Sequence, residues 1–535
     1  MKDINKEIEQ IFFEEKNNVF LVDAKTGKEM LYGEVQAIAE KVANDMVIRG
    51  ISAGDNVAIM LPNSLECALV YFACLFNGAV AVPINPILLP EEVEFILRDC
   101  NAKKIYFSEK TRDCLTEEIL EEYGEDAISV KISSPSSDTQ NSKDGLDFFN
   151  LSISNLKKGI SQNNQEIMAI VYTSGTTGRP KGVMIRKDGM LRNAQAFCKE
   201  LGIDNGNRFY GVLSMAYLGG YYNLLMLPFM GRSSVVISPT FSAETALNFW
   251  DIPTRYNVNT LWFVPTIMSI LLQTDRGIAG QEFCQSNIKL CLCGTAPLSK
   301  SLRNKFETKY GLTIYENYGL SETFFLTTQS PNTQNHEGSV GHVMPKVSIS
   351  IQSEEGEPLP IGEEGRIYCR TPYIMKGFWK KEETPHPDGT DWFDTGDVGI
   401  YSPTGGLFIT GRQKDLIIRG GINISPRSVE DVLEKYKEIK QAEIVGVPHS
   451  VYGEDIVAVV ILEKPGTLDN FKSDIVKYCK EGLNPLKQPS RFIEITEFPV
   501  GNTGKVLKKK LREIIINKLN RKRILGNSTG KDNGS

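Results

Sequence analysis

The chain has 535 residues, of which 41% are hydrophobic and 24% are charged, and its formal net charge at pH 7 is −6. A single hydrophobic core stops growing at roughly 250–300 residues, so this length excludes a one-core protein and predicts at least two lobes. The negative net charge argues against a general nucleic-acid binder. The ten cysteines include no C-x-x-C pair, which excludes a disulfide framework and predicts reduced thiols in a cytoplasmic protein.

Short apolar segments alternate with helical ones along the first part of the chain. The predicted order is strand, helix, strand, helix and strand, over residues 56–61, 64–77, 79–84, 91–100 and 103–107. This alternation predicts α/β layers with largely parallel strands. The most hydrophobic run, Ala68 to Ile84, is interrupted by Asn77, Gly78 and Pro83. We therefore interpret it as a buried helix followed by a strand, and we expect no membrane-spanning segment.

A strand predicted at residues 166–173 leads into the segment YTSGTTGRPKG, residues 172–182. Its glycines let backbone N–H groups turn inward around an anion, its hydroxyl groups are further donors, and Arg179 and Lys181 add positive charge. A strand followed by such a loop is typical of polyphosphate binding, although the spacing does not match the G-x-x-x-x-G-K-[ST] loop. The candidate phosphate-binding residues are Thr173, Ser174, Gly175, Thr176, Thr177, Gly178 and Lys181.

The pattern of the chain changes after about Gly411, where short strands and helices form a compact α+β set. We therefore expect a large N-terminal lobe over residues 1–411 and a small C-terminal lobe over residues 412–520. The last residues, 521–535, are rich in glycine, asparagine, serine and charge, which predicts a disordered tail.

YTSGTTGRPKGV resembles the phosphate loop of the acyl-adenylate-forming superfamily, which includes acyl- and aryl-CoA synthetases, stand-alone adenylation enzymes and firefly-type luciferases. Further segments resemble the landmarks of this superfamily in the same order: CGTAPL at 293–298, ENYGLSET at 316–323, WFDTGDVG at 392–399, GRQKDLIIRGGINISPRSVE at 411–430 and PVGNTGKVLKKK at 499–510. The resemblance extends from about residue 10 to about residue 515. It implies an α/β fold, with layered α/β subdomains in the large lobe and a small α+β lobe that rotates about a hinge.

Within ENYGLSET, Tyr318 offers a flat face on which adenine can stack, and Ser321 and Glu322 offer hard oxygen ligands for Mg²⁺ on a nucleotide phosphate. The resemblance implies that Ser321 also contacts the α-phosphate, and it assigns Asn317 and Gly319 to the nucleotide site. It further implies that CGTAPL lines the adenine and acyl sites, through Thr295, Ala296 and Pro297.

The resemblance also implies roles for residues nearer the C-terminus. Asp397 would accept the ribose hydroxyls, Arg412 would reach the ribose and phosphates, and Lys414 is the expected hinge residue. Lys505 is the expected catalytic residue, because its compact charge would lie between the substrate carboxylate and the α-phosphate. Gly421 would let the pantetheine arm of CoA pass close to the backbone.

The function implied by the resemblance is ATP-dependent activation of a carboxylic acid to acyl-AMP with release of pyrophosphate, followed by transfer of the acyl group to CoA. The enzyme would be an AMP-forming acid–thiol ligase that uses ATP, Mg²⁺ and CoA. Three alternatives stay open: a stand-alone enzyme that loads the acyl group onto a carrier-protein thiol, a luciferase-like oxygenase, and a non-catalytic adenylate-binding regulator. A homodimer also stays open.

The segment LSMAYLGGYYN, residues 213–223, holds no acidic residue that could pair with an amino group, which favours an acid without one. Gly319 stands where acetate-activating relatives have tryptophan, so the resemblance implies room for a longer acyl or an aryl group. Thr295 would narrow the entrance, and Tyr217 stands where many relatives have histidine. Together these residues predict a medium- or long-chain acyl or an aryl acid, in a pocket lined by Tyr217, Thr295 and Gly319.

Overall fold

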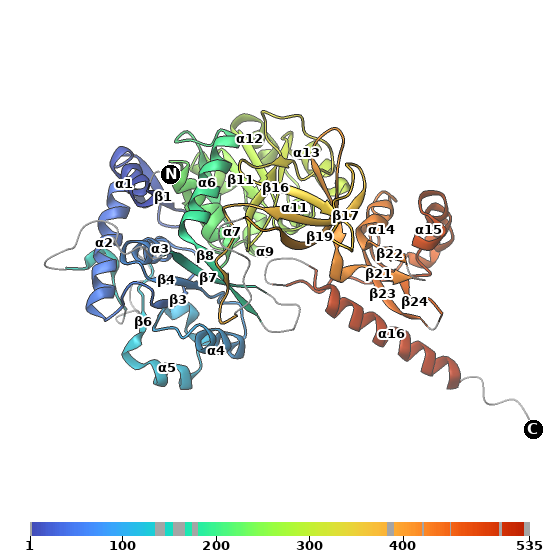
Figure 1. Cartoon of the computed structure of the whole chain (residues 1–535), viewed down its shortest axis with the longest axis horizontal. Coiled ribbons are helices and arrows are strands. Elements are labelled where there is room, and N and C mark those ends of the chain that lie inside the picture. Colours follow the sequence, from blue (N-terminus) through green and yellow to red (C-terminus); the bar gives the residue numbers. More distant parts are fainter. Residues whose placement is uncertain are drawn as a thin grey trace, which may run out of the picture.

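The strands of the chain form four sheets, which are divided between a large lobe and a small one (Figure 1). The structure is a computed structural model, and it describes residues 3–133, 145–152, 166–173, 180–381, 390–419, 422–449, 451–501 and 506–528. The predicted fold class is confirmed, because layered α/β subdomains make up the large lobe and a smaller α+β lobe follows them.

The first sheet has seven strands in the order β18-β8-β7-β4-β3-β5-β6. The five strands from β7 to β6 are parallel, as predicted, whereas β8 runs antiparallel to β7 and β18 runs antiparallel to β8. The strands are β3 (Asn56–Met60), β4 (Val80–Pro83), β5 (Lys104–Phe107), β6 (Ala127–Ser129), β7 (Ile167–Thr173), β8 (Lys181–Arg186) and β18 (Gly377–Phe378). Their helices include α3 (Leu65–Asn77), α4 (Pro90–Asp99) and α5 (Glu117–Tyr123).

Helix α3 shows how local sequence sets an element of this sheet. The Ser64 side chain caps its start by accepting a hydrogen bond of 3.1 Å from the Cys67 N–H. Gly78 ends it at φ 84°, a left-handed conformation that suits glycine, and its N–H donates to the Cys74 carbonyl at 2.8 Å. Every residue of the helix is buried, so the prediction of a buried helix that ends at Gly78 is confirmed.

The second sheet has nine strands in the order β15-β14-β13-β12-β11-β9-β10-β1-β2. Its centre, from β1 to β13, is parallel. The strands are β1 (Val19–Asp23), β2 (Glu29–Leu31), β9 (Arg208–Gly211), β10 (Ser234–Ile237), β11 (Thr260–Phe263), β12 (Leu290–Cys293), β13 (Ile314–Leu320), β14 (Phe324–Thr328) and β15 (His342–Val343). One large hydrophobic core connects this sheet with helices of the first subdomain.

Helices surround the two large sheets (Figure 1). They are α1 (Ile4–Glu14), α2 (Tyr32–Ile48), α6 (Lys187–Leu201), α7 (Leu218–Tyr221), α8 (Leu227–Met230), α9 (Ala243–Leu247), α10 (Asp251–Arg255), α11 (Pro265–Thr274), α12 (Ala279–Asn287) and α13 (Lys300–Tyr310). The π-helical turn η4 (Tyr222–Met226) joins α7 to α8. Such turns are uncommon and often occur at functional sites.

The third sheet is antiparallel and lies between the second sheet and the small lobe in the chain order. Its strands are β16 (Ser348–Gln352), β17 (Glu364–Arg370), β19 (Phe393–Tyr401) and β20 (Leu407–Arg412), and the turn η5 (Gln413–Asp415) follows. The alternation of strands and helices that predicts parallel layers does not extend to this part of the chain.

The small lobe has its own sheet, in the order β22-β21-β24-β23 with β25 paired to β24. Its strands are β21 (Ile417–Arg419), β22 (Ile422–Ile424), β23 (Ile439–His449), β24 (Gly453–Leu462) and β25 (Arg491–Glu494). Helices α14 (Pro426–Leu433) and α15 (Leu468–Gly482) contribute to one hydrophobic cluster on this sheet, and α16 (Lys508–Ser528) contributes to another. Because α16 continues to Ser528, the first part of segment 521–535, predicted as a disordered tail, is helical in the structure.

All ten cysteines are free, and nine of them are buried, as expected for reduced core thiols. Within the described ranges, no helix combines the length and the apolar character that a membrane crossing needs.

Candidate active site

The carboxyl ends of the parallel strands in the nine-stranded sheet meet at one edge of the large lobe. Tyr217 and Thr295 lie in the loops that leave β9 and β12, and Gly319 is the next-to-last residue of β13. Ligands of open α/β sheets bind outside the carboxyl ends of the strands. The topology therefore brings the three predicted acyl-site residues to the edge at which a ligand is expected.

Asp397 is the centre of a polar cluster between the second and third sheets. Its Oδ2 accepts a hydrogen bond of 2.7 Å from the Tyr318 hydroxyl, and its Oδ1 lies 2.8 Å from Nε of Arg412. Arg412 is the register partner of Asp397 across β19 and β20. The Asp397 side chain is 3% exposed, whereas that of Arg412 is 45% exposed. The buried Asp397 carboxylate is thus held by Tyr318 and Arg412, and the Arg412 guanidinium is exposed to solvent.

The Thr-Gly-Asp segment of β19, where the pairing with β17 is irregular, fixes the backbone of Asp397. Gly396 adopts φ 71° and donates its N–H to Asp394 at 2.9 Å. The Thr395 hydroxyl donates to the Ile367 carbonyl at 2.7 Å and accepts from the Asp397 N–H at 3.2 Å. Burial, together with the negative Asp397, raises the pKa of Tyr318 well above its ordinary value. The phenol therefore stays protonated and keeps donating to the carboxylate.

Glu322 lies in the turn between β13 and β14, close to this cluster. Burial raises the pKa of its carboxyl group, Asp397 raises it further, and the positive Arg412 and Lys181 lower it. Asp397, Arg412 and Lys181 are therefore close enough to Glu322 for their charges to act on it. Ser321 precedes Glu322 in the same turn and is half-buried.

The fit of this turn to Mg²⁺ follows from its oxygen atoms. Within the residues that the structure describes, no group of three or more His, Cys, Asp and Glu side chains could hold a metal by itself. Mg²⁺ is commonly bound through one or two carboxylates together with substrate phosphates. A single half-buried carboxylate, Glu322, near positive groups that would attract phosphate fits that mode.

The loop after β12 contains an unusual residue, Thr295. It adopts φ 69°, which is strained for a β-branched side chain, and its buried hydroxyl has no hydrogen-bond partner. Strained backbone and unpaired buried polar atoms occur at binding sites. Nδ2 of Asn317 donates to the Cys293 carbonyl at 3.0 Å, and a Cβ on Gly294 would overlap the Asn317 side chain. The ends of β12 and β13 are therefore locked together.

The β7–β8 hairpin carries the predicted phosphate loop, and its last described pair is Thr173 opposite Lys181. Trp379 braces this hairpin, because its N–H donates to the Gly182 carbonyl at 2.7 Å and its indole N–H donates to the Asp99 carbonyl at 2.8 Å. Tyr172 donates its hydroxyl to the Asp99 carboxylate. The base of the loop is therefore fixed in the first subdomain.

Several predicted residues lie outside the described part of the chain. They are Ser174, Gly175, Thr176, Thr177, Gly178, Gly421 and the expected catalytic Lys505. On either side of the Lys505 segment, Val500 pairs with Val506, and the Leu507 N–H donates to the Pro499 carbonyl at 2.7 Å. Their roles stay predictions.

The structure gives Gly319 a role that the sequence does not reveal. A Cβ at this position would overlap the backbone carbonyl of Phe324, so the close approach of β14 requires glycine here, whatever the size of the acid. In the same way, a Cβ on Gly219 would overlap the ring of Tyr217. Lys414, the predicted hinge residue, is exposed in η5, and Ala296 and Pro297 follow Thr295 in its loop.

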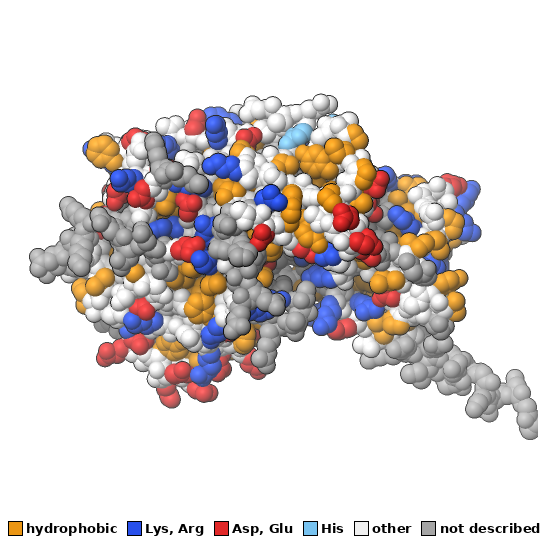
Figure 2. Space-filling model, viewed as in Figure 1, with side chains coloured by type: hydrophobic (Ala, Val, Ile, Leu, Met, Phe, Trp, Pro, Cys, Tyr) orange, Lys and Arg blue, Asp and Glu red, His pale blue; other side chains and the backbone are white. Residues whose placement is uncertain are grey.

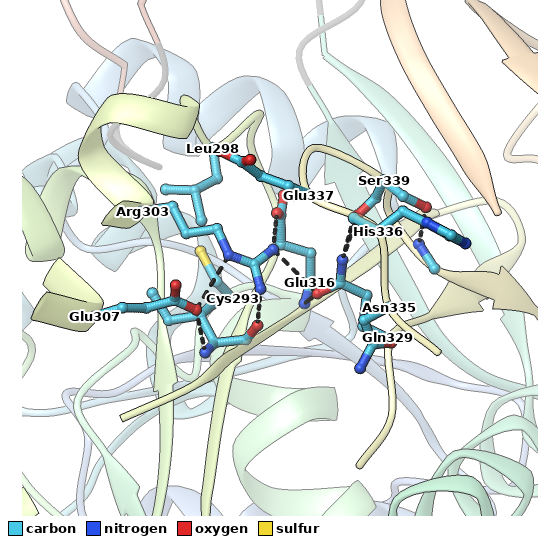
Figure 3. Close-up of polar contacts among 12 residues, drawn as sticks. Cys293, Leu298, Arg303, Glu307, Glu316, Gln329, Asn335, His336, Glu337 and Ser339 are labelled. Atoms are coloured by element: carbon cyan, nitrogen blue, oxygen red, sulfur yellow. Dashed lines mark hydrogen bonds and ion pairs between the residues drawn. The ribbon is translucent and has the colours of Figure 1, made fainter. Parts of the chain in front are cut away.

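Sequence reasoning missed a buried charge network next to this site (Figure 3). Arg303 donates to Glu316 at 2.8 Å, to Gln329 at 3.2 Å and to Glu307 at 3.1 Å. Burial raises the pKa of Glu316 to about 7, although Arg303 lowers it. Glu316 directly precedes Asn317 on β13, so the network supports the strand that carries the nucleotide residues. The sequence contains a pattern that predicts this network, because Arg303 is spaced from Phe306 and Tyr310 so that all three lie on one face of α13, the buried face.

Basic side chains gather where the large and small lobes meet, on the face of the molecule shown in Figure 2. A polyanionic nucleotide would be attracted to such a junction, because its phosphates carry several negative charges in a small volume.

Comparison with known proteins identifies the family of the chain. A family model described as "AMP-binding enzyme" matches residues 10–379, and one described as "AMP-binding enzyme C-terminal domain" matches residues 428–505. A long-chain-fatty-acid–CoA ligase of Bacillus subtilis is 30% identical over 91% of this chain and 90% of its own length. A sulfoacetate–CoA ligase of Cupriavidus necator is 28% identical over 92% of this chain and 94% of its own.

Among solved structures, ATP-bound MatB from Rhodopseudomonas palustris is similar with a TM-score of 0.82 and 26% identity, over 96% of this chain and 99% of its own. The apo structure of the same protein, over the same shares of both chains, gives a TM-score of 0.74. The arrangement of this chain is therefore nearer to the nucleotide-bound structure of that relative than to its apo structure.

Proposed function

From the premise that the chain belongs to the AMP-binding enzyme family, in the CoA-ligase branch of the acyl-adenylate-forming superfamily, we propose how its residues divide the work of an AMP-forming acid–thiol ligase. Enzymes of this class activate a carboxylic acid with ATP to form acyl-AMP and then transfer the acyl group to CoA. The observation that carries the proposal is the cluster of Tyr318, Asp397 and Arg412 beside Glu322 and Lys181.

In this proposal the cluster binds the nucleotide. Asp397 accepts the ribose hydroxyls, because its carboxylate is already oriented by Tyr318 and Arg412 and needs no rearrangement when ATP arrives. Arg412 and Lys181 face the phosphates. The unpaired hydroxyl of Thr295 supplies a further polar contact at the carboxyl end of β12.

The first step is attack of a carboxylate oxygen on the α-phosphorus, which forms the acyl–phosphate bond and releases pyrophosphate. Both reactants are negative, so the step requires positive groups where charge accumulates. Arg412 and Lys181 supply fixed charge, and Lys505 would add a compact charge between the carboxylate and the α-phosphate. Glu322 and Ser321 would hold Mg²⁺, which neutralises phosphate charge when bound.

The lobe boundaries are part of the proposal. Residues 1–411 would form the adenylation lobe, residues 412–520 the mobile lobe that carries Lys505 and Gly421, and residues 521–535 the tail. Lys414 would be the hinge, and its exposed position in η5, between β20 and β21, supports that role. The CoA thiol would attack the adenylate after Lys505 has been removed by rotation of the small lobe.

Buried aromatic side chains behind Gly319 favour a compact acid, such as an aryl acid, over a long extended chain. The ring centroids of Phe324 and Phe325 lie 4.9 Å and 5.5 Å from that of Tyr222, in the π-helical turn. Oδ1 of Asn193 accepts hydrogen bonds from the Tyr222 hydroxyl at 2.6 Å and from the Phe325 N–H at 3.1 Å. These hydrogen bonds hold Tyr222 and Phe325 together. With Phe324 they form an aromatic wall that a long acyl chain would have to displace.

The identity of the substrate acid cannot be inferred from sequence similarity, because the relatives are named for acids as different as long-chain fatty acids and sulfoacetate. The predicted range, a medium- or long-chain acyl or an aryl acid, therefore needs a direct test. Pyrophosphate release would be measured with ATP and Mg²⁺ across straight-chain acids from acetate to stearate and a set of aryl acids, each with and without CoA.

We expect release with aryl or compact acids, and a strong increase when CoA is added. Release that is unaffected by CoA would favour a carrier-protein thiol as acceptor. Release with the longest straight chains alone would contradict the compact-acid proposal, and no release with any acid would contradict adenylation itself.

A further inference from the structure

Arg427 forms a polar contact between the small lobe and the loop that leaves β12. It is the second residue of α14, and its Nη2 donates to the Leu298 carbonyl at 3.1 Å. Its Nε lies 2.9 Å from Oδ1 of Asp431, one turn along the same helix. Leu298 ends the loop of Thr295, Ala296 and Pro297, so the guanidinium touches the predicted nucleotide loop from the other lobe.

The surroundings of Arg427 keep it charged. Burial alone would lower its pKa, but Asp431, Glu434, Glu430 and Glu443 raise it above the ordinary value. These carboxylates all belong to the small lobe, whereas the hydrogen bond that Arg427 donates to the large lobe goes to a backbone carbonyl. The acidic groups therefore keep the guanidinium positively charged, and the Leu298 carbonyl accepts its hydrogen bond.

The effect of Arg427 reaches beyond its direct contact. Its positive charge lowers the pKa of Glu316, the buried partner of Arg303 that precedes the nucleotide residues on β13. Arg427 therefore acts electrostatically on the strand that carries Asn317 and Tyr318. Glu434, from the same lobe, also lies near Ser299, which caps the start of α13.

A second contact between the lobes serves as a comparison. Nζ of Lys305 lies 3.4 Å from Oε1 of Glu463, and the two side chains are 55% and 48% exposed. Exposed pairs of this kind contribute little. This pair, unlike Arg427, does not touch the loop of residues 294–298.

We propose that Arg427 is a positioning residue for acyl-adenylate formation: by binding the Leu298 carbonyl, it docks the small lobe on the nucleotide loop. The chain as a whole is more similar to an ATP-bound relative than to the apo form of that relative, which agrees with this step. The proposal rests on the two-step function proposed above. Because the contact joins the two lobes, rotation of the small lobe breaks it. Arg427 then has no part in the attack of the CoA thiol on the adenylate.

The test compares the two half-reactions in the full chain. Arg427→Ala, Arg427→Lys and the control Lys305→Ala would be assayed for pyrophosphate release with the best acid, and for acyl-CoA formation from a synthetic acyl-adenylate and CoA. A hydrogen bond from a charged group has a net worth that corresponds to about a 10- to 100-fold effect. We expect this loss in pyrophosphate release for Arg427→Ala, less than a two-fold loss in acyl-CoA formation, partial rescue by lysine, and no change for Lys305→Ala.

Equal losses in both half-reactions, or unchanged pyrophosphate release in Arg427→Ala, would overturn the proposal. Failure of the proposed function is distinguishable, because the wild-type protein would then release no pyrophosphate with any acid. Hydrogen–deuterium exchange gives a readout that does not depend on turnover. With ATP bound, residues 294–299 and 426–433 should be protected in the wild type and in Lys305→Ala but lose protection together in Arg427→Ala, and equal protection in all three proteins would also overturn the proposal.

Discussion

The large-lobe side of the active site is held together by hydrogen bonds and ion pairs among its own residues, whereas Arg427 joins the described part of the small lobe to the nucleotide loop through one hydrogen bond. Asp397 is held by Tyr318 and by Arg412, which lies at the lobe boundary but ends strand β20 of the third sheet, and β13 is supported by the buried Arg303–Glu316 pair. On the other side, Arg427 binds one backbone carbonyl. This difference agrees with our proposal that the large lobe holds fixed binding groups and that the small lobe brings in groups needed for only one step.

The largest effect is expected when the positive charge that the small lobe would bring to the site is removed. Lys505→Ala should slow pyrophosphate release by about 10²–10³-fold, the range typical for the loss of one group that stabilises charge in a transition state. Acyl-CoA formation from a supplied acyl-adenylate should be largely unchanged. Quench-flow measurement of each half-reaction checks both statements, and equal loss in the two would contradict the division between the lobes.

A smaller effect is expected from changes in the Asp397 cluster of the large lobe. Asp397→Asn keeps the shape of the side chain but removes the charge that pairs with Arg412, so KM for ATP should rise by about 10- to 100-fold. Tyr318→Phe, which removes only the hydroxyl, should raise it less. Steady-state kinetics with ATP as the varied substrate gives both values, and in contrast to Lys505→Ala the thiol step should also suffer, because AMP stays bound there. An unchanged KM for ATP in Asp397→Asn would show that this carboxylate does not bind the nucleotide.

Shortening Phe324, one of the aromatic residues packed against Tyr222, should change which acids the enzyme prefers. Phe324→Gly removes a ring that lies against Tyr222 and places glycine at φ 56°, a conformation that glycine adopts without strain. We expect kcat/KM for straight-chain acids to rise by about ten-fold relative to that for the best aryl acid, because a methylene-sized gain in an apolar pocket is worth 10–200-fold. Competition between two acids for limiting enzyme measures the ratio, and Leu326→Ala, deeper in the same strand, is the control for general loosening. A ratio unchanged in Phe324→Gly would place the acid elsewhere.

The smallest effect concerns pH. The pKa of Glu316 is about 7, above its ordinary value of 4.5. A carboxyl group whose pKa is raised by folding binds its proton more tightly in the native state, so its contribution to stability is complete below about pH 4.5 and is lost as the pH rises through 7. Thermal unfolding should therefore show a stability that falls between pH 5 and pH 7, and Glu316→Gln should remove on the order of 1 kcal/mol of that fall. A steeper fall in the variant would contradict the assignment.

The elements that the sequence predicts correctly are those set by local patterns. Helix α3 with its Gly78 end and strand β7 follow from capping, glycine position and apolar runs. The pairing of Asp397 with Arg412 depends on the register of two strands, and the hydrogen bond from Tyr318 crosses between two sheets. The motifs predict which residues belong to the site, but not how they bind one another.

Other features depend on contacts that no local pattern encodes. Gly319 is required by the backbone of β14, Phe324 takes a left-handed conformation that its sequence does not suggest, and Arg427 meets a loop more than a hundred residues away. The antiparallel third sheet was also not anticipated. Arg303 is the exception, because its spacing from Phe306 and Tyr310 on α13 places it on the buried face.

The central claim is that one site makes an acyl-adenylate and transfers its acyl group to CoA. The most direct test incubates the protein with ATP, Mg²⁺, CoA and the best acid, and quantifies the products by chromatography and mass spectrometry. The account predicts AMP, pyrophosphate and acyl-CoA in equal amounts, with acyl-AMP accumulating on the enzyme when CoA is omitted. Formation of ADP and phosphate, or of AMP without any acyl-CoA, would contradict it.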